Sequence, residues 1–145
     1  MKVHHMNKSN EGSKKIESNI VYIDHDVLPD IYPLVKFTDV LITDYSSIFF
    51  DYILLDRPVI FAPFDFKKKK KKVGFFYNYF EIVCGPITRN WNEVANEIDK
   101  SLNGKDTFKD KRHEVKSEFN KFKDGKSSKR VFELVESVLD KSRQK

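Results

Sequence analysis

Three short apolar segments rich in β-branched residues alternate with segments of helical character, and this order constrains the fold more than any other feature of the chain. The segments are Ile20–Asp24, Val40–Thr43 and Val59–Ala62. Helices are expected between them over Asp30–Phe37, with Pro33 in the first turn, and over Ser46–Leu55. The order strand, helix, strand, helix, strand predicts βαβ units and therefore an α/β fold with a parallel sheet and flanking helices.

The second half of the chain is predominantly helical. We expect a helix over Trp91–Leu102 capped by Asn90, a charged helix over Phe108–Phe122, and a C-terminal helix spanning about residues 126–140. With 145 residues the chain has the length of a single domain, residues 1–145. A doubly wound sheet normally contains more than three strands, so we expect this domain to be a fragment of a longer two-domain protein.

The charge, the cysteine and histidine content and the apolar runs of the sequence limit which partners and which cellular location are expected. The net charge of +5 favours anionic partners such as nucleotides, phosphate polymers, nucleic acid or a membrane surface, and it does not choose among them. Cys84 is the only cysteine, which fits a reducing cytoplasm, and the four histidines lack metal-ligand spacing, so we predict no metal site. No apolar run is long enough to cross a bilayer, so any membrane association is predicted to be peripheral.

The segment Leu41–Tyr52 carries the chemistry, because it places two hydroxyls between the end of a strand and the start of a helix. In open α/β sheets, ligands bind beyond the carboxyl ends of the strands. A helix N-terminus adds unpaired backbone N–H groups, which suit a phosphate. Ser46 and Ser47 are thus candidate phosphate ligands. The alternative is that these serines only cap the helix, which is a common role for serine.

The segment Thr43–Tyr52 resembles the signature of the CDP-glycerol glycerophosphotransferase family, which includes teichoic acid polymerases and primases. The similarity continues in further blocks that cover most of the chain from about Asn19 onward. These blocks are Leu55–Phe61, Gly74–Tyr79, Gly85–Pro86 and Asp124–Arg130. The central block is highly specific, and the terminal block is less so.

The resemblance implies the C-terminal, donor-binding half of a GT-B architecture, which consists of two Rossmann-like domains with the active site between them. Thr43, Ser46 and Ser47 would then belong to the CDP-binding site, with the two serines on the diphosphate. Family members also carry a Lys-x-His-Pro segment, which Lys2–His5 matches except that His5 replaces the proline. By this resemblance His4 would neutralise the diphosphate or protonate the leaving CMP. The alternative for His4 is a surface residue.

Three aspartates around these blocks are further candidates. Asp51 lies one helical turn after Ser47, where it could bind a ribose or glycerol hydroxyl, or could simply be an exposed helix residue. Asp124 could contact the nucleotide from the last loop, or could only order the Asp124–Gly125 turn. Asp44 is expected to order the turn before the helix through backbone hydrogen bonds.

The implied reaction transfers glycerol phosphate from CDP-glycerol, or a related CDP-polyol, to a hydroxyl of a lipid-linked teichoic acid or capsule polymer and releases CMP. The resemblance places the general base on a histidine of the N-terminal domain, which we expect this chain to lack, so the fragment alone is predicted to be inactive. No cofactor is implied. The rival interpretations are a stand-alone nucleotide- or polyanion-binding fragment and a GT-B sugar-nucleotide glycosyltransferase.

The loop after the third strand departs from the family pattern. Val73 stands where an arginine is common, Asn78 replaces an aspartate, and Lys67–Lys72 is an unbroken lysine run. The run is either a solvated loop or a patch that attracts an anionic membrane, which would put the protein on the cytoplasmic face of the cell membrane. No aromatic residues interleave it, so we predict no nucleic-acid partner.

Overall fold

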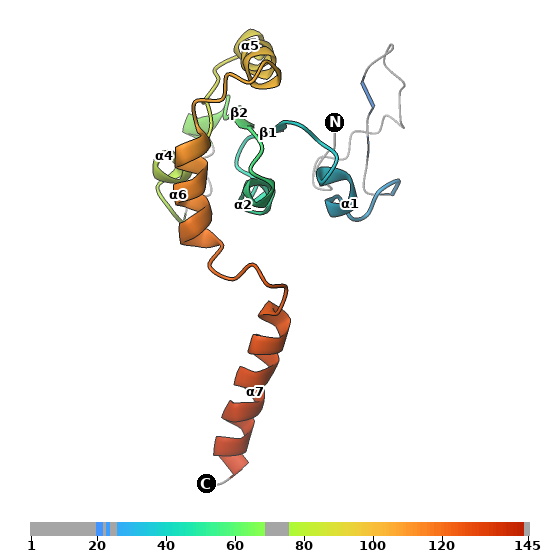
Figure 1. Ribbon diagram of the computed structural model, residues 1–145, viewed down its shortest axis with the longest axis vertical. Coiled ribbons are helices and arrows are strands. Elements are labelled where there is room, and N and C mark those ends of the chain that lie inside the picture. The colour runs from blue at the N-terminus through green and yellow to red at the C-terminus, as the bar shows by residue number, and fades with distance from the viewer. Residues whose placement is uncertain (1–19, 22, 24–25, 69–75, 144–145) are drawn as a thin grey trace. The chain divides into compact units, whose positions relative to one another are not determined.

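The computed structural model describes residues 20–21, 23, 26–68 and 76–143, which divide between two compact units, residues 1–38 and 39–145 (Figure 1). In the first unit, α1 spans Tyr32–Val35 with a proline in its first turn, as the sequence predicts, although the helix is shorter than the predicted Asp30–Phe37. The Asp30 carboxylate accepts a hydrogen bond from the Tyr32 N–H at 3.0 Å, which places Asp30 before the helix rather than in it. The predicted strand Ile20–Asp24 lies partly outside the described residues, and Ile20 and Ile23 each form a single β-bridge.

The second unit contains two strands of the predicted parallel sheet. Strand β1 spans Leu41–Thr43 and β2 spans Val59–Phe61, and they pair in parallel with Thr43 opposite Phe61. A further parallel bridge joins Phe61 to Ile87. Two of the three predicted strands are therefore confirmed within one residue at each end, and a segment that the sequence did not mark as a strand lies beside β2.

The helices predicted for the second unit are all present, although several differ at their ends, and α4 is an addition. Their bounds are α2 Ile48–Tyr52, the 3₁₀ helix η1 Ile53–Leu55, α4 Tyr79–Ile82, α5 Trp91–Leu102, α6 Lys109–Phe119 and α7 Ser127–Arg143. The bounds of α5 and its Asn90 cap are confirmed, since the Asn90 side chain accepts from the Glu93 N–H at 3.0 Å. The helix predicted over Phe108–Phe122 ends at Phe119, and α7 continues past its predicted end at about residue 140 to Arg143.

The helix predicted over Ser46–Leu55 is two elements, because its last turn tightens from α to 3₁₀ geometry. It stops at Asp56, which adopts the left-handed region with φ 53°. Pro58 follows two residues later, and the residue before a proline is disfavoured in a helix. The chain then enters β2 directly, so α2 and η1 form the crossover between the two parallel strands.

The core of the second unit is built around β2, of which every residue is buried. Helix α2 packs on β1 and α5 packs on β2 (Figure 1). The other buried apolar residues of this core are Phe49, Tyr52, Ile53, Tyr79, Val83, Cys84, Val94 and Val115. Burial raises the pKa of the Cys84 thiol to about 11, so this group stays protonated and acts as a small apolar side chain.

A buried arginine joins α6 to the rest of the core. Arg112 is 1% exposed, and its guanidinium donates to Asp106 at 3.0 and 2.5 Å and reaches Asp56 at 3.5 Å. His113 also lies 3.0 Å from Asp56. Two side chains of α6 and its C-cap bond to backbone oxygens of the crossover: Lys116 to Leu54 at 3.1 Å and Asn120 to Phe50 at 2.9 Å. These contacts hold α2 and η1 against α6.

No helix in the described part of the chain is long and apolar enough to cross a membrane. Helix α7 is amphipathic and none of its described residues is buried. Its exposed apolar side chains are Val131, Phe132, Leu134, Val135, Val138 and Leu139.

We predict that Gly85→Ala strongly destabilises the domain. A Cβ on Gly85 would lie 1.8 Å from the backbone oxygen of Val59, which cannot move without breaking the sheet. Overpacking of this kind typically costs about 1–3 kcal/mol, and a clash with backbone should reach or exceed the top of that range. The matched control is Gly104→Ala, which meets nothing within 4 Å and carries only the cost of its positive φ. Urea unfolding checks both variants, and equal losses of unfolding free energy would contradict the packing argument.

We also predict that Asp106 makes the folded domain less stable as the solution becomes acidic. The hydrogen bonds from Arg112 hold the pKa of Asp106 below its ordinary value. The stabilisation is therefore present above the unfolded pKa of about 4 and is lost as the pH falls through the folded pKa. Asp106→Asn should cost about 2–3 kcal/mol at pH 7 and flatten the loss of stability as the pH falls below about 5. Unfolding curves across this range test it, with Glu97→Gln, which breaks the exposed Lys100 pair, as the control expected to change little.

Candidate functional site

The described site lies at the carboxyl edge of the parallel strands. The chain leaves β1 into Asp44–Ser47, leaves β2 into Ala62–Asp65, and leaves the Ile87 bridge into Thr88–Trp91. Because these strands are parallel, all three connections emerge at the same edge of the sheet. This edge is where open α/β sheets bind their ligands.

Hydrogen bonds fix the connection between β1 and α2. The Ala62 N–H donates to the Thr43 carbonyl at 2.8 Å, which extends the strand pairing to the end of β1. The Asp44 carboxylate accepts from the Tyr45 N–H at 2.6 Å, so Asp44 orders the turn as the sequence predicts. Thr43 is buried, whereas Ser46 and Ser47 are exposed. The turn therefore presents both serines to solvent at the strand end.

The two serines differ in what they do for the helix. Ser47 occupies the N-cap position of α2, yet its side chain makes no capping hydrogen bond. The Ser46 hydroxyl accepts from the Ile48 N–H, but at 3.4 Å the contact is long. Capping alone thus accounts poorly for this pair, because a strong serine cap bonds closely to the second or third helical N–H.

Aromatic side chains hold this turn against the rest of the domain. The Tyr79 hydroxyl donates to the Asp44 carbonyl at 2.9 Å, and the Tyr45 hydroxyl donates to the Asp65 carboxylate at 2.8 Å. The Tyr45 and Tyr79 rings lie 5.7 Å apart, and Phe66 contacts both. Burial raises the pKa of both phenols, and the Asp65 carboxylate adds to the effect at Tyr45. Both hydroxyls therefore remain protonated donors that tie the turn in place.

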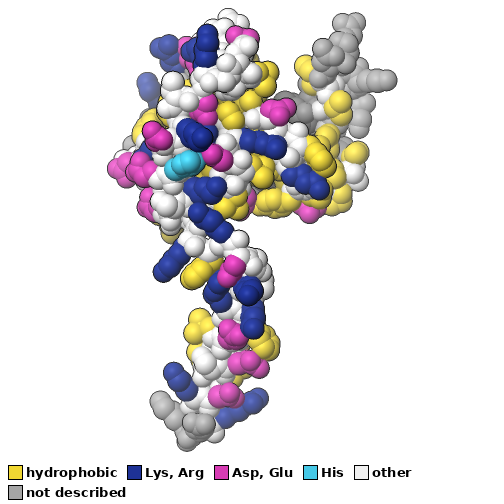
Figure 2. All heavy atoms as spheres, in the orientation of Figure 1, with side chains coloured by type: hydrophobic (Ala, Val, Ile, Leu, Met, Phe, Trp, Pro, Cys, Tyr) yellow, Lys and Arg dark blue, Asp and Glu magenta, His cyan; other side chains and the backbone are white. Residues whose placement is uncertain are grey.

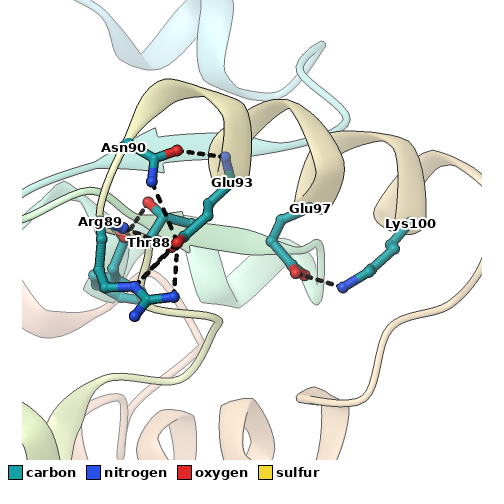
Figure 3. Close-up of polar contacts among 7 residues, drawn as sticks. Thr88, Arg89, Asn90, Glu93, Glu97 and Lys100 are labelled. Carbon is teal, nitrogen blue, oxygen red and sulfur yellow. Dashed lines mark hydrogen bonds and ion pairs between the residues drawn. The ribbon is translucent and has the colours of Figure 1, made fainter.

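The third connection begins α5 with a network of polar contacts (Figure 3). Thr88 is buried and its hydroxyl donates to the Phe61 carbonyl at 2.9 Å, which anchors the connection to β2. Glu93 accepts from the Arg89 N–H at 2.8 Å and pairs with the Arg89 guanidinium at 2.8 Å. The Arg89 side chain is nevertheless 86% exposed, so a cation stands at this edge in a defined orientation.

The sequence did not single out the Tyr45–Asp65 and Arg89–Glu93 pairs as parts of the site. Tyr45 and Asp65 are twenty residues apart, and only the parallel pairing of the strands brings them together. The available signal was positional, since Tyr45 and Asp65 follow the last residues of two predicted strands closely. Arg89 and Glu93 have the ordinary i, i+4 spacing of a helix start, which gives no hint of a ligand.

The remaining predicted site residues fall in different places. Asp51 is exposed on α2, close in sequence to the serines. Asp124 lies between α6 and α7, where its carboxylate accepts from Arg130 and from the Lys126 N–H, which lies 3.1 Å away. These contacts give Asp124 the turn-ordering role, and its contact with a nucleotide stays a prediction. His4 lies outside the described residues.

The surface of this unit is rich in basic side chains. Lys and Arg gather over α6 and the segment that follows it on the face drawn in Figure 2, where acidic side chains interrupt them. The lysines of this region are Lys109, Lys111, Lys116, Lys121, Lys123 and Lys126. Among the described residues, no group of three or more His, Cys, Asp or Glu side chains is arranged to hold a metal ion.

A small parallel sheet with flanking helices and two exposed serines at a strand end has the layout of a ligand-binding α/β domain. The chain belongs to the CDP-glycerol:poly(glycerophosphate) glycerophosphotransferase family, whose pattern matches residues 1–137. The family resemblance inferred from the sequence motifs is thereby confirmed.

Curated relatives are enzymes of teichoic acid synthesis. The chain is 32% identical over 126 residues to a teichoic acid poly(ribitol-phosphate) polymerase of Bacillus spizizenii, covering 87% of this chain and 20% of that protein. It is 30% identical over 132 residues to a teichoic acid glycerol-phosphate primase of Bacillus subtilis, covering 86% of this chain and 33% of that protein. The chain thus spans between a fifth and a third of the length of these relatives.

Solved structures of a wall teichoic acid polymerase, TagF, share the fold. One aligns with a TM-score of 0.66 and 31% sequence identity, covering 84% of this chain and 30% of the polymerase chain. A variant of that polymerase soaked with CDPG aligns with a TM-score of 0.65 and 30% identity, covering 86% of this chain and 31% of the polymerase chain.

Proposed function

We propose that this chain is the donor-binding part of an enzyme that transfers glycerol phosphate from CDP-glycerol to a hydroxyl of a lipid-linked teichoic acid or capsule polymer and releases CMP. The observation that carries the proposal is the pair of exposed serines at the carboxyl end of β1, within the segment that matches the family. The variant of TagF that was soaked with CDPG supports a CDP-linked donor.

In this proposal Ser46 and Ser47 donate hydrogen bonds to oxygens of the donor diphosphate. Helix α2 has only five residues, so the two hydroxyls and the N–H groups of the turn contribute more than a helix dipole does. The acceptor oxygen attacks the β-phosphorus, the bond from that phosphorus to the CMP oxygen breaks, and CMP leaves. Fixed donors on the diphosphate stabilise the charge that accumulates on the leaving group.

Other roles in the reaction belong to residues beyond this edge. Asp51 would bind a hydroxyl of the ribose or of the glycerol, and Asp124 would approach the nucleotide from the last loop. His4 would neutralise the diphosphate or protonate the departing CMP. We assign the base that activates the acceptor to a second Rossmann-like domain, which would complete a GT-B cleft with this one.

The identity of the polyol has a second candidate. Relatives include enzymes named for ribitol phosphate as well as for glycerol phosphate. CDP-ribitol is therefore the alternative donor, and it would place the same CDP group on the same serines. Competition between CDP-glycerol and CDP-ribitol for the chain distinguishes the two, since the preferred polyol binds more tightly.

A peripheral position on the cytoplasmic face of the membrane accompanies this function, because a lipid-linked acceptor stays at the bilayer. The net charge of +5 and the basic side chains over α6 favour an anionic surface (Figure 2). Lys67–Lys72 would add to this attraction, at roughly 1 kcal/mol for each lysine that reaches an anionic bilayer.

We predict that Ser46→Ala/Ser47→Ala lowers the affinity for CDP-glycerol without unfolding the domain. A hydrogen bond to a charged group contributes about 1.5–3 kcal/mol, so the loss of both hydroxyls should weaken binding at least tenfold. Isothermal titration calorimetry measures the affinity. Thermal unfolding should be nearly unchanged, because Ser47 makes no cap hydrogen bond and that of Ser46 is long.

The matched control is Ser117→Ala/Ser137→Ala, which removes two exposed helix serines whose hydroxyls bond to carbonyls of their own helices. This variant should bind CDP-glycerol like the parent chain. Unchanged affinity in the Ser46/Ser47 variant would leave these serines with a helix-start role alone.

We further predict that the 145-residue chain binds the donor but does not extend a polymer by itself. It corresponds to a fifth to a third of the relatives' length, and loss of a general base typically costs about 10²–10⁴-fold in rate. The measurement is CMP release from CDP-glycerol with a lipid-linked primer, with and without the remainder of a relative supplied in trans. Robust extension by the chain alone would contradict the assignment of the base to another domain.

A further inference from the structure

An exposed aromatic pair stands at the same edge of the sheet as the two serines and has no part in the function proposed so far. Phe64 follows β2 and is 44% exposed, and Trp91 begins α5 and is 65% exposed. Their ring centroids lie 5.3 Å apart at an interplanar angle of 84°. Large aromatic side chains normally bury most of their surface. Phe64 and Trp91 instead leave much of theirs exposed, and this apolar surface is available to a ligand.

The topology sets this pair beside the serines. Ser46 lies three residues after β1, Phe64 three residues after β2, and Trp91 four residues after the Ile87 bridge. Neighbouring strands are about 4.8 Å apart, so the β1 and Ile87 positions are separated by about 10 Å across the sheet. A nucleotide whose diphosphate lies on the connection after β1 places its base a comparable distance away, on the far side of the ribose.

Direct contacts link these connections to one another. The Tyr45 hydroxyl bonds to Asp65 at 2.8 Å, which joins the residue before Ser46 to the residue after Phe64. The Phe64–Trp91 ring contact then joins the second connection to the third. The aromatic pair is therefore held at a defined place relative to the serine turn.

We propose that Phe64 and Trp91 form the surface on which the nucleobase of the CDP donor stacks. The inference rests on the proposed function, since it takes the diphosphate to lie on Ser46 and Ser47. An exposed ring accepts a base on its π-face, and such stacking is tolerant of base identity. The Arg89 guanidinium, which Glu93 orients from the start of the same helix, stands two residues from Trp91 as a donor for the carbonyl oxygen of a pyrimidine (Figure 3).

The chain offers a direct probe of this site, because Trp91 is its only tryptophan. Titration with CMP should change the intrinsic fluorescence of Trp91 in a saturable way, since a stacked base quenches the indole. Inorganic pyrophosphate and glycerol 3-phosphate carry no base, and they should bind without that change. Calorimetry on the same samples gives the affinity of each ligand independently of the fluorescence.

Single substitutions test how much the Phe64 and Trp91 rings contribute to the affinity for CMP. Trp91→Ala and Phe64→Ala should each weaken CMP binding about 5- to 150-fold and leave pyrophosphate binding unchanged. Trp91→Phe keeps a ring and should retain most of the CMP affinity. The matched control is Phe122→Ala, which removes an aromatic of similar exposure from the segment after α6. Far-UV circular dichroism and thermal unfolding verify that each variant is folded.

The outcomes separate this proposal from the one on which it rests. Quenching by CMP together with selective loss of CMP affinity in the Trp91 and Phe64 variants supports the stacking surface. CMP binding that needs Ser46 and Ser47 but leaves Trp91 fluorescence and the Trp91→Ala affinity unchanged overturns the stacking surface and keeps the diphosphate site. Absence of any CMP or CDP-glycerol binding to the folded chain overturns both.

Discussion

The pairing of β1 with β2 in parallel is the constraint on which the rest of the domain depends. It brings the connections after Thr43, Phe61 and Ile87 to one edge, so residues twenty or more positions apart in the sequence meet there. Gly85 makes this arrangement possible, because only a residue without a side chain passes the Val59 carbonyl at that distance. The candidate site is thus a product of sheet topology, and its hydroxyls, rings and cation come from three separate segments.

A second set of interactions holds the crossover between the strands in place. Arg112 is buried and pairs with the partly exposed Asp106 and Asp56, and a buried charge is tolerable only when it is paired and hydrogen-bonded. Lys116 and Asn120 donate to carbonyls of η1 and α2, which such short helices cannot all satisfy within their own turns. Helix α6 therefore supports the crossover that follows the serine turn.

Local sequence patterns predicted the helices and strands well, but they did not predict the contacts between residues that are far apart in the sequence. Val40–Thr43 and Val59–Ala62 were recognisable as strands from β-branched residues, and Asn90 as a helix cap from its side-chain chemistry. Arg112 could not be identified as a core residue, since an arginine in a charged helix normally faces solvent and nothing local marks its partners. The serines were found from their place between a strand and a helix and from the family motif, whereas Phe64 and Trp91 become neighbours only once the sheet is assembled.

We propose that the donor diphosphate lies on the turn between β1 and α2, and a crystal structure of the chain with CDP-glycerol would show its position. We expect diphosphate oxygens within hydrogen-bond distance of the Ser46 and Ser47 hydroxyls, at the carboxyl end of β1. A nucleotide bound elsewhere on the domain, with neither serine hydroxyl in contact with it, would mean that these serines do not form the donor site.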